Sequence, residues 1–333
     1  MFISIIIPNR NGAATIARCL EAAFTSRFEK SFEVVVVDDA SSDNSAEIIR
    51  RFPCRLIRLA RHHGAAGARN AGAAHSRGEM LFFTDADCLL REDTLALAWQ
   101  ALSAYDPRTV AGGTYTPLPC DDSFFSRFQS AFIHYSETKR AADPDYVATH
   151  ALAIYAETFR RHGGFAEGFL PILEDVEFSH RLRRAGCRLV MDPAIQVRHI
   201  FNFTLLRSLR NACVKAMYWA LYSLRNRDLF ADSGTASHEL KASVAAYFIG
   251  TLCLGAYFLT AAPAWLGLTF ALVAGDLHVN RGLLRGFRAA GGRLFAAAAT
   301  LYYLFVYPLA VGTGAIGGAA LFLARAFRSG NPR

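Results

Sequence analysis

The sequence predicts an α/β domain with a mostly parallel central sheet, followed by an amphipathic helix and by membrane helices. Three observations predict this fold class. Strand-like and helix-like segments alternate through the first part of the chain, acidic clusters follow two of the strands, and the composition becomes apolar and basic near residue 200. Because alternating strands and helices form a parallel sheet covered by helices, we expect a folded domain at 1–202, an interfacial helix at 203–230 and a membrane region at 242–326.

The predicted strands are short apolar runs bounded by loop residues. The first, FISIII at 2–7, is unbroken and stops at PNRNG, as a strand buried on both faces does. Strands are also expected at 32–37, 54–59 and 80–84, with helices at 13–25, 44–52 and 64–76 and one beginning near Asp93. Ligands of such sheets bind beyond the carboxyl ends of the strands. We therefore expect the loop 8–12 and the acids at 38–39 and 85–87 to share one crevice.

The alternation stops between residues 110 and 200. An irregular segment rich in Pro and Asp leads to a Gly-Gly-Phe turn at 163–165. The residues 173–182 predict a helix, which Gly186 ends. A strand-like run follows at 188–191.

The composition excludes several classes of protein. With 333 residues, 53% hydrophobic and 19% charged, the chain is more apolar than most soluble enzymes. Residues 201–333 carry 13 Lys/Arg against 4 Asp/Glu, and these basic residues flank apolar runs, which argues against nucleic acid as a partner. The seven scattered cysteines show no CxxC spacing, so we expect a reducing cytosol, with neither a disulfide framework nor a zinc site.

The apolar C-terminal part predicts membrane attachment. Residues 204–226 project as an interfacial amphipathic helix, and 242–279 fit a hairpin that crosses the bilayer and returns. The positive-inside rule then holds the arginine loop at 280–293 in the cytoplasm. The stretch 294–326 fits a broken helix or a second hairpin, and the basic tail at Arg325, Arg328 and Arg333 favours the hairpin.

The same patterns predict the location of the first domain. Its start shows no charged lead or cleavage site of a signal peptide. We expect a multi-pass protein of the inner cell membrane with this domain on the cytoplasmic face. On the amphipathic helix, Arg207, Arg210 and Lys215 fit either a lipid phosphate or ordinary interfacial anchoring.

Two carboxylates one residue apart follow the strand at 80–84, in the stretch FFTDADC. Asp85 and Asp87 suit Mg²⁺ or Mn²⁺, which bind carboxylates together with substrate phosphates, and such an ion would neutralise a departing diphosphate. The alternative is that they cap the helix that begins near Asp93.

Further polar residues leave two interpretations open. Asp38 and Asp39 suit a nucleobase or ribose, or the cap of the next helix. Arg69, within HGAAGARNAG, suits a phosphate, or belongs to a helix packed on the sheet through its small residues. Asp175 suits a general base that accepts a proton from an attacking hydroxyl, or a helix cap. His199 suits a third metal ligand or a structural role.

Several of these motifs together resemble a known family. IIIPNRNG, VVVVDDASSD, HGAAGARNAG, FTDADC, GGF and EDVEFSHRLRRAG, followed by His199, occur in the order seen in family 2 glycosyltransferases of the glycosyltransferase-A fold. The resemblance covers roughly residues 2–200. It implies an inverting, metal-dependent transferase that uses a nucleotide-diphosphate sugar.

The resemblance also implies roles for individual residues. Asp39 would face the base, Asp85 the ribose, and Asp175 would be the base that deprotonates the acceptor. The metal ligands would be Asp87 and His199. The nucleotide-sugar-binding residues would be Pro8, Asn9, Asp38, Asp39, Arg69, Asp85 and Glu174.

Two features indicate the acceptor: a departure from the family pattern, and the apolar C-terminal part of the chain. Processive members carry a QxxRW element, and none follows Asp175, so transfer of a single sugar is expected. A transferase tied to a membrane would most simply use a lipid or lipid-linked glycan as acceptor. Whether the chain forms a homo-oligomer stays open.

Two other classes of protein share some of these features. The first is a nucleotide-binding membrane module without catalysis. The second, a dehydrogenase, requires a glycine fingerprint after the first strand, which Asn9-Arg10-Asn11-Gly12 does not provide.

Overall fold

The computed structural model describes residues 2–229 and 231–329, and the chain forms two compact units. The first contains residues 1–121 and 137–201, and the second residues 122–136 and 202–333. The second unit thus includes most of α5 (Phe124–Thr138), which the sequence analysis expected inside the first domain. Arg333, part of the basic tail, lies outside the described residues.

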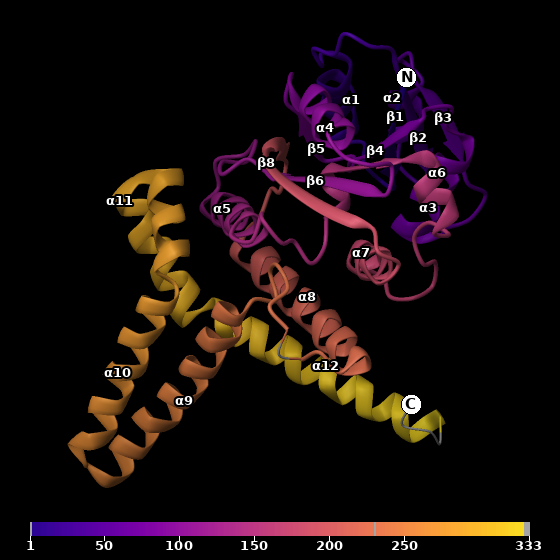
Figure 1. Cartoon of the computed structure of the whole chain (residues 1–333). Coiled ribbons are helices and arrows are strands. Elements are labelled where there is room, and N and C mark those ends of the chain that lie inside the picture. Colours follow the sequence, from indigo (N-terminus) through magenta and orange to yellow (C-terminus); the bar gives the residue numbers. More distant parts are fainter. Residues whose placement is uncertain (1, 230, 330–333) are drawn as a thin grey trace. The chain divides into compact units, whose positions relative to one another are not determined.

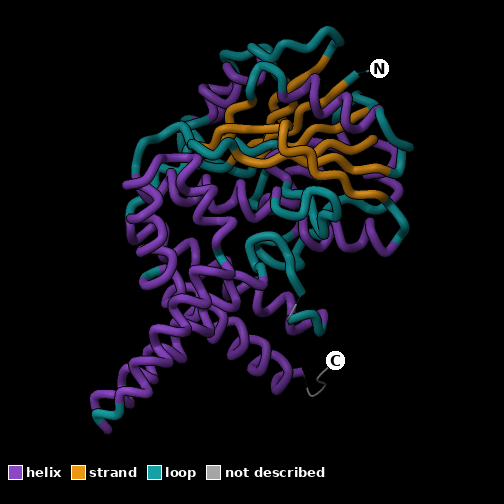
Figure 2. Tube along the Cα trace, turned by 60° about the vertical axis from the view of Figure 1, so that its left-hand side comes forward, coloured by secondary structure: helices purple, strands orange, loops and turns teal. Residues whose placement is uncertain are grey.

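The first unit is built on one sheet, whose strands are orange in Figure 2. Their order is β3-β2-β1-β4-β7-β6-β8-β5. The strands are β1 (Ile3–Asn9), β2 (Phe32–Asp38), β3 (Arg55–Arg58), β4 (Met80–Phe83), β5 (Cys88–Leu90), β6 (Thr109–Tyr115), β7 (Leu152–Tyr155) and β8 (Arg188–His199). The part from β3 to β4 is parallel, as predicted, whereas β7 pairs antiparallel with both of its neighbours and β5 pairs antiparallel with β8. The sequence did not indicate these antiparallel pairs because they join strands that are distant in the chain.

Helices cover both faces of the sheet (Figure 1). They are α1 (Ile16–Phe24), α2 (Ser45–Ile49), α3 (Gly64–His75), α4 (Thr94–Ser103), α6 (Ala156–Arg161) and α7 (Glu174–Arg184), and Thr149–Ala151 forms a 3-10 turn. One face packs its core, which includes Ile6, Phe83 and Ile154, against Phe159 of α6 and Phe178 of α7. These side chains are fully or almost fully buried, because strands with apolar residues on both faces must be covered on both sides.

The second unit is helical. It consists of most of α5 with α8 (Leu205–Asn226), α9 (His238–Thr260), α10 (Pro263–Val279), α11 (Arg281–Phe305) and α12 (Tyr307–Ser329). Aromatic residues of α5 pack against α11 and α12. The rings of Phe128 and Tyr302 lie 4.8 Å apart, and those of Phe132 and Tyr307 lie 5.6 Å apart. The helical spacing of Phe124, Phe128 and Phe132 was the signal for α5 in a segment expected to be irregular.

Two expectations for the C-terminal part need correction. The basic segment is helical and not a loop: α11 begins at Arg281, because the arginines are spaced along a helix that contains apolar residues. The chain turns back at Gly292 (φ 77°), so that the rings of Phe287 and Tyr303, on either side of this turn, lie 6.5 Å apart. The stretch 294–326 contains one break, at Val306, whose φ of −115° and ψ of −49° stay near helical values. The chain therefore continues as a broken helix, and the described residues contain no hairpin reversal there.

A buried polar cluster joins three helices of the second unit. Asp276 of α10 accepts hydrogen bonds from Ser243 of α9 and Asn280, both at 2.7 Å. The hydroxyl of Tyr303 of α11 donates to the Asn280 side chain at 3.0 Å. Because every member has a partner, this cluster fixes the helices without exposing a polar group to the apolar surroundings.

Candidate active site

A cleft of about 560 Å³ opens where the carboxyl ends of β1, β2 and β4 meet. It is lined by residues from each of the three predicted loops. Seven of the predicted site residues line it, namely Pro8, Asn9, Asp39, Arg69, Asp85, Asp87 and His199. Parallel strands bring them together, because their carboxyl ends lie at one edge of the sheet.

Asp87 and His199 lie side by side although 112 positions separate them in the sequence. Cys88 of β5 pairs directly with His199 of β8, and the backbone N–H of Ile200 donates to the carbonyl of Asp87 at 2.9 Å. This pairing places His199 Nε2 3.4 Å from the Asp87 carboxylate. Together with the Cys88 sulfur, their ligand atoms lie within 4.8 Å of one another, so the group could hold a metal ion.

The charges around Asp87 favour a cation. Burial and the neighbouring charge of Asp85 raise the pKa of Asp87 to about 7. A bound divalent ion would offset both effects, since an opposite charge stabilises the carboxylate. Burial and the two aspartates also raise the pKa of the Cys88 thiol, so the carboxylate and the imidazole are the better ligands.

Asp85 takes a different role from Asp87. Its carboxylate accepts a hydrogen bond from Arg69 Nη2 at 2.6 Å, and Arg69 Nη1 donates to Glu174. Burial alone would raise the pKa of Asp85, but the charge and hydrogen bond of Arg69 hold it below its ordinary value. Neither Asp85 nor Asp87 caps α4, because Asp93 occupies its N-cap position.

Arg69 forms ion pairs with two acidic residues inside the protein. Its side chain is 5% exposed and joins α3 to β4 through Asp85 and to α7 through Glu174. Burial alone would lower the pKa of Arg69, but the charges of these two acids raise it above its ordinary value. Glu174 itself is buried and lies outside the cleft lining, so its expected contact with the nucleotide sugar is replaced by this ion pair.

Removing the bridge should destabilise the protein. Arg69→Met would leave the carboxylates of Asp85 and Glu174 without their cation, and breaking a buried ion pair on one side costs about 3–5 kcal/mol. Thermal unfolding of the full chain should show a clearly lower midpoint. Arg69→Lys keeps the charge but lacks the guanidinium group that binds both acids. Its unfolding midpoint should lie between those of Arg69→Met and the parent protein. Equal midpoints for all three would show that the bridge contributes nothing to stability.

The two adjacent aspartates at the end of β2 point in opposite directions, because side chains alternate along a strand. Asp39 lines the cleft, and its carboxylate accepts from the backbone N–H groups of His63 at 2.7 Å and Gly64 at 2.9 Å. It thereby binds the N-terminus of α3, where a negative charge is favourable, and lies 2.6 Å from His62 Nδ1. Asp39 thus fixes the loop that forms one wall of the cleft.

Asp38 lies outside the cleft, contrary to its expected nucleotide contact. It is fully buried and accepts hydrogen bonds from Asn9 Nδ2 and Arg58 Nε, both at 3.3 Å. Its role in the structure is to hold Asn9, which does line the cleft.

Asp175 lies in the first turn of α7 and outside the cleft lining. Its two oxygens accept from the backbone N–H groups of Val176 at 2.9 Å and Thr149 at 3.3 Å. The side chain stays partly exposed. Burial and the charge of Glu174 raise its pKa to about 6. Because Leu173, in the left-handed region at φ 73°, occupies the capping position, Asp175 is not the N-cap.

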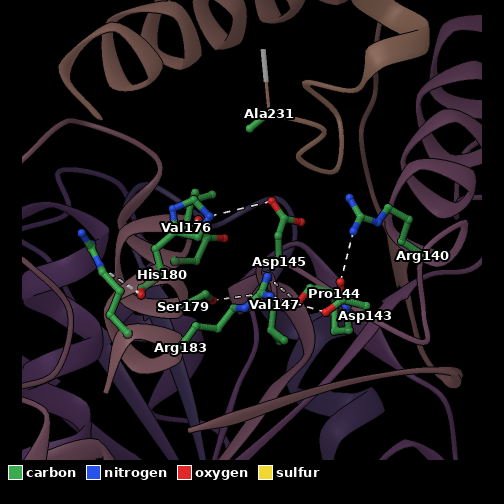
Figure 3. A network of polar contacts seen from close by, with 12 residues as sticks. Arg140, Asp143, Pro144, Asp145, Val147, Val176, Ser179, His180, Arg183 and Ala231 are labelled. Atoms are coloured by element: carbon green, nitrogen blue, oxygen red, sulfur yellow. Dashed lines mark hydrogen bonds and ion pairs between the residues drawn. The ribbon is translucent and has the colours of Figure 1, made fainter. Parts of the chain in front are cut away.

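The outer face of α7 is tied to the segment 143–147 (Figure 3). Ser179 Oγ accepts from the backbone N–H of Val147 at 3.0 Å, and Arg183 lies 3.4 Å from Asp143. His180 lies 3.8 Å from Asp145. These contacts fix the turn that carries Asp175 against Thr149.

Several residues of this site were not expected from the sequence. Arg10 and His62 also line the cleft, and Arg10 is exposed there. Behind the metal group, Tyr115 stacks on His150 with ring centres 4.0 Å apart and meets His199 edge-on at 5.0 Å. The position of Arg10 directly after the first strand was an available signal. Nothing in the sequence pointed to Tyr115 or His150.

Comparisons with known proteins agree with this geometry. The sequence model described as glycosyl transferase family 2 matches residues 4–162. Glycosyltransferase AglE of Haloferax volcanii is 33% identical over 239 residues, which cover 69% of this chain and 78% of AglE. The chain belongs to glycosyltransferase family 2. As a member of this family it is a transferase, which decides against the dehydrogenase and the non-catalytic module.

Two further similarities concern the fold and one part of the chain. One solved structure of similar fold is that of the mannosyltransferase PcManGT from Pyrobaculum calidifontis, in complex with GDP-Man and Mn²⁺. The match covers 96% of this chain and 86% of the PcManGT chain, with a TM-score of 0.57 and 22% identity. This likeness shows the glycosyltransferase-A fold. An undecaprenyl-phosphate 4-deoxy-4-formamido-L-arabinose transferase of Edwardsiella ictaluri is 34% identical over 94 residues, 26% of this chain and 29% of that protein.

Proposed function

We propose that this family 2 glycosyltransferase is an inverting, metal-dependent enzyme that moves one sugar from a nucleotide-diphosphate sugar to a lipid or lipid-linked acceptor. The observation that carries the proposal is the cleft itself. One wall presents Asp39 and the first loop, and the other presents the Asp87–His199 pair, both at the carboxyl ends of the strands.

The donor is assigned to this cleft. The nucleoside would lie against Pro8, Asn9 and Asp39, whose carboxylate oxygens retain lone pairs for further hydrogen bonds. The ribose would lie near Asp85. Arg10 is exposed in the cleft and supplies a cation for the diphosphate.

Asp87 and His199 would hold Mg²⁺ or Mn²⁺. Carboxylate and imidazole groups are ligands for such ions, and PcManGT was solved with Mn²⁺. When bound, the ion neutralises the departing diphosphate as a Lewis acid. The protein positions these ligands through the pairing of β5 with β8 and keeps Asp85 ionised through Arg69.

Asp175 would act as the general base. A carboxylate whose pKa is about 6 is mostly ionised at neutral pH and accepts a proton better than an ordinary aspartate. The acceptor hydroxyl loses its proton to Asp175 and attacks the anomeric carbon as the bond to the diphosphate breaks. A single in-line attack inverts the configuration at that carbon.

Arg10 provides a test of the donor site. Replacing Arg10 by Ala should raise KM for the nucleotide sugar about 10- to 100-fold, the range for losing a charged hydrogen bond of about 1.5–3 kcal/mol. The matched control is Arg50→Ala, which removes an exposed arginine that does not line the cleft. Equal effects of the two substitutions on KM would remove Arg10 from the site.

The acceptor and the location follow from the second unit. Two helical stretches, His238–Thr260 and Arg281–Phe327, are long and apolar enough to cross a bilayer by length and composition. Only 11% of the most apolar part of His238–Thr260 is buried, and Phe258 and Leu259 of this helix are 77% and 89% exposed. Such apolar surface is stable in lipid but not in water. We therefore assign the protein to the inner membrane, with the catalytic unit on the cytoplasmic face.

The decisive experiment supplies the purified protein with a panel of nucleotide sugars and a membrane lipid extract. We expect one donor to be consumed and one lipid to gain the mass of a single sugar, with inverted configuration. Addition of several sugars to one acceptor would overturn single transfer, and a product of retained configuration would overturn the mechanism.

A further inference from the structure

Three buried side chains lie behind the Asp87–His199 pair, outside the lining of the donor cleft. They are Tyr115 of β6, His150 of the 3-10 turn and Glu137, all within the first unit. Each of them is buried. Because they do not line the cleft, a role in donor binding does not explain them.

Two aromatic rings hold the imidazole of His199 from different directions. The ring of Phe201 stacks on it, with ring centres 3.9 Å apart and an angle of 16° between the planes. The ring of Tyr115 meets it edge-on, at 5.0 Å and 78°. The χ2 angle of a histidine is otherwise broadly distributed. A face contact combined with an edge contact fixes the plane of the imidazole, and with it the direction of Nε2 toward Asp87.

The sheet places Tyr115 beside His199. Tyr115 pairs with Val197 in the parallel register of β6 and β8. His199 follows Val197 by two positions, so these two side chains lie on the same face of β8. Strand pairing therefore sets the position of the Tyr115 backbone relative to His199, and only the orientation of the Tyr115 ring needs further contacts.

The Tyr115 ring also packs against a buried pair of ionisable side chains. It stacks on His150, with ring centres 4.0 Å apart and an angle of 24° between the planes. His150 Nε2 lies 3.4 Å from Glu137 Oε2, which also accepts a hydrogen bond from the Thr114 hydroxyl at 2.7 Å. Apolar residues of similar volume often give equal or greater stability than such a buried pair. Stability alone therefore does not account for the pair, whereas fixing the Tyr115 ring does.

We propose that Tyr115 is a positioning residue that orients the metal ligand His199, and that Glu137 and His150 hold the Tyr115 ring in place. A ligand whose direction is fixed in advance loses little freedom when the ion binds, which strengthens binding. This inference rests on the metal role given to His199 under the proposed function. It adds that the affinity for the metal depends on side chains outside the cleft.

The test measures Mn²⁺ binding to the full chain in lipid nanodiscs without nucleotide, through the EPR signal of the free ion. Pulsed EPR reports in addition whether an imidazole nitrogen is bound to Mn²⁺. We expect Tyr115→Leu to weaken Mn²⁺ binding about 10- to 100-fold, the usual effect of removing a side chain that orients a metal ligand, and to weaken the nitrogen signal. Tyr115→Phe keeps the ring and should bind Mn²⁺ as the parent protein does.

A second variant tests the ionisable pair without leaving a buried charge. Glu137→Gln/His150→Leu removes both charges, keeps an acceptor for the Thr114 hydroxyl and removes the ring that stacks on Tyr115. Its unfolding midpoint should be near that of the parent protein or higher, because no unpaired charge is left in the core. Its Mn²⁺ affinity should nevertheless fall about tenfold.

Phe159→Leu is the matched control. Phe159 is a buried ring of the same unit, and it packs on Phe83, Phe165 and Phe178 instead of on His199. Its replacement should lower the unfolding midpoint without changing Mn²⁺ binding.

The outcomes separate this inference from the proposed function. Equal Mn²⁺ affinities of Tyr115→Leu and the parent protein would overturn the role of Tyr115 and leave His199 as a ligand. Equal losses of affinity in Tyr115→Leu and Phe159→Leu would also overturn it, because any loosening of the core would then act on the site. A parent protein that lacks the nitrogen signal, as His199→Ala should, would remove His199 from the metal site and the inference with it. If the affinities change as expected but no sugar reaches a lipid, the inference stands and the proposed acceptor fails.

Discussion

Replacing Asp175 by Asn is expected to lower kcat by about 10²–10⁴-fold, the usual contribution of a general base. The amide keeps the size of the side chain and one acceptor oxygen for the backbone N–H groups of Thr149 or Val176, but it cannot take the proton of the acceptor hydroxyl. Binding of the nucleotide sugar should be retained, because Asp175 does not line the donor cleft. Initial rates and a separate measurement of donor binding distinguish the two effects.

The control for this substitution is Asp143→Asn, on the segment that contacts the outer face of α7. Its exposed ion pairs contribute little, about 0–1 kcal/mol, so its activity should be near that of the parent. Activity of Asp175→Asn within a few fold of the control would show that another group is the base.

The pH dependence tests the same residue. Since the pKa of Asp175 is raised to about 6 from an ordinary value of 3.8, the carboxylate becomes protonated as pH falls through about 6, and kcat should fall with it. The contribution of Asp175 to the free energy of unfolding depends on pH in the opposite direction. It is fully present below pH 3.8 and is lost as pH rises through about 6. Loss of activity at pH 5 would therefore not reflect unfolding caused by Asp175, and a rate independent of pH between 5 and 7 would contradict the assignment.

Removal of the metal is expected to have a second large effect. EDTA should abolish sugar transfer, and Mn²⁺ or Mg²⁺ should restore it in the parent protein. Asp87→Asn should lower kcat/KM by about 10³-fold, because Lewis-acid stabilisation amounts to several kcal/mol and each 1.36 kcal/mol is a factor of ten. High Mn²⁺ should not rescue this variant fully, since the amide brings no charge to the ion.

Asp93→Asn is the matched control for Asp87→Asn. Asp93 follows β5, whereas Asp87 precedes it, and Asp93 is exposed and lies outside the cleft. It should respond to EDTA and Mn²⁺ as the parent does. Full activity of EDTA-treated parent protein would remove the role given to Asp87 and His199.

The sequence by itself determined the alternating α/β core and the convergence of its loops. Apolar runs such as Ile3–Ile7 and Val34–Val37 can be stable only as buried strands, and parallel strands place their carboxyl ends together. Residues near in the sequence to these ends, including Asn9, Asp39 and Asp85, therefore fall in one cleft. The long apolar C-terminal helices were predictable for the same reason, since length and composition alone define them.

Only the tertiary structure decided which of two neighbouring acids faces the cleft and which side chains meet across long separations. Asp38 and Asp39 differ by one position, and strand alternation turns one inward and the other to the cleft. The bridge from Arg69 to Glu174 spans 105 positions, and the pairing of Cys88 with His199 depends on antiparallel strands that no local pattern indicates. Local sequence specifies which residues are buried, but the partner of a buried charge depends on how distant elements pack.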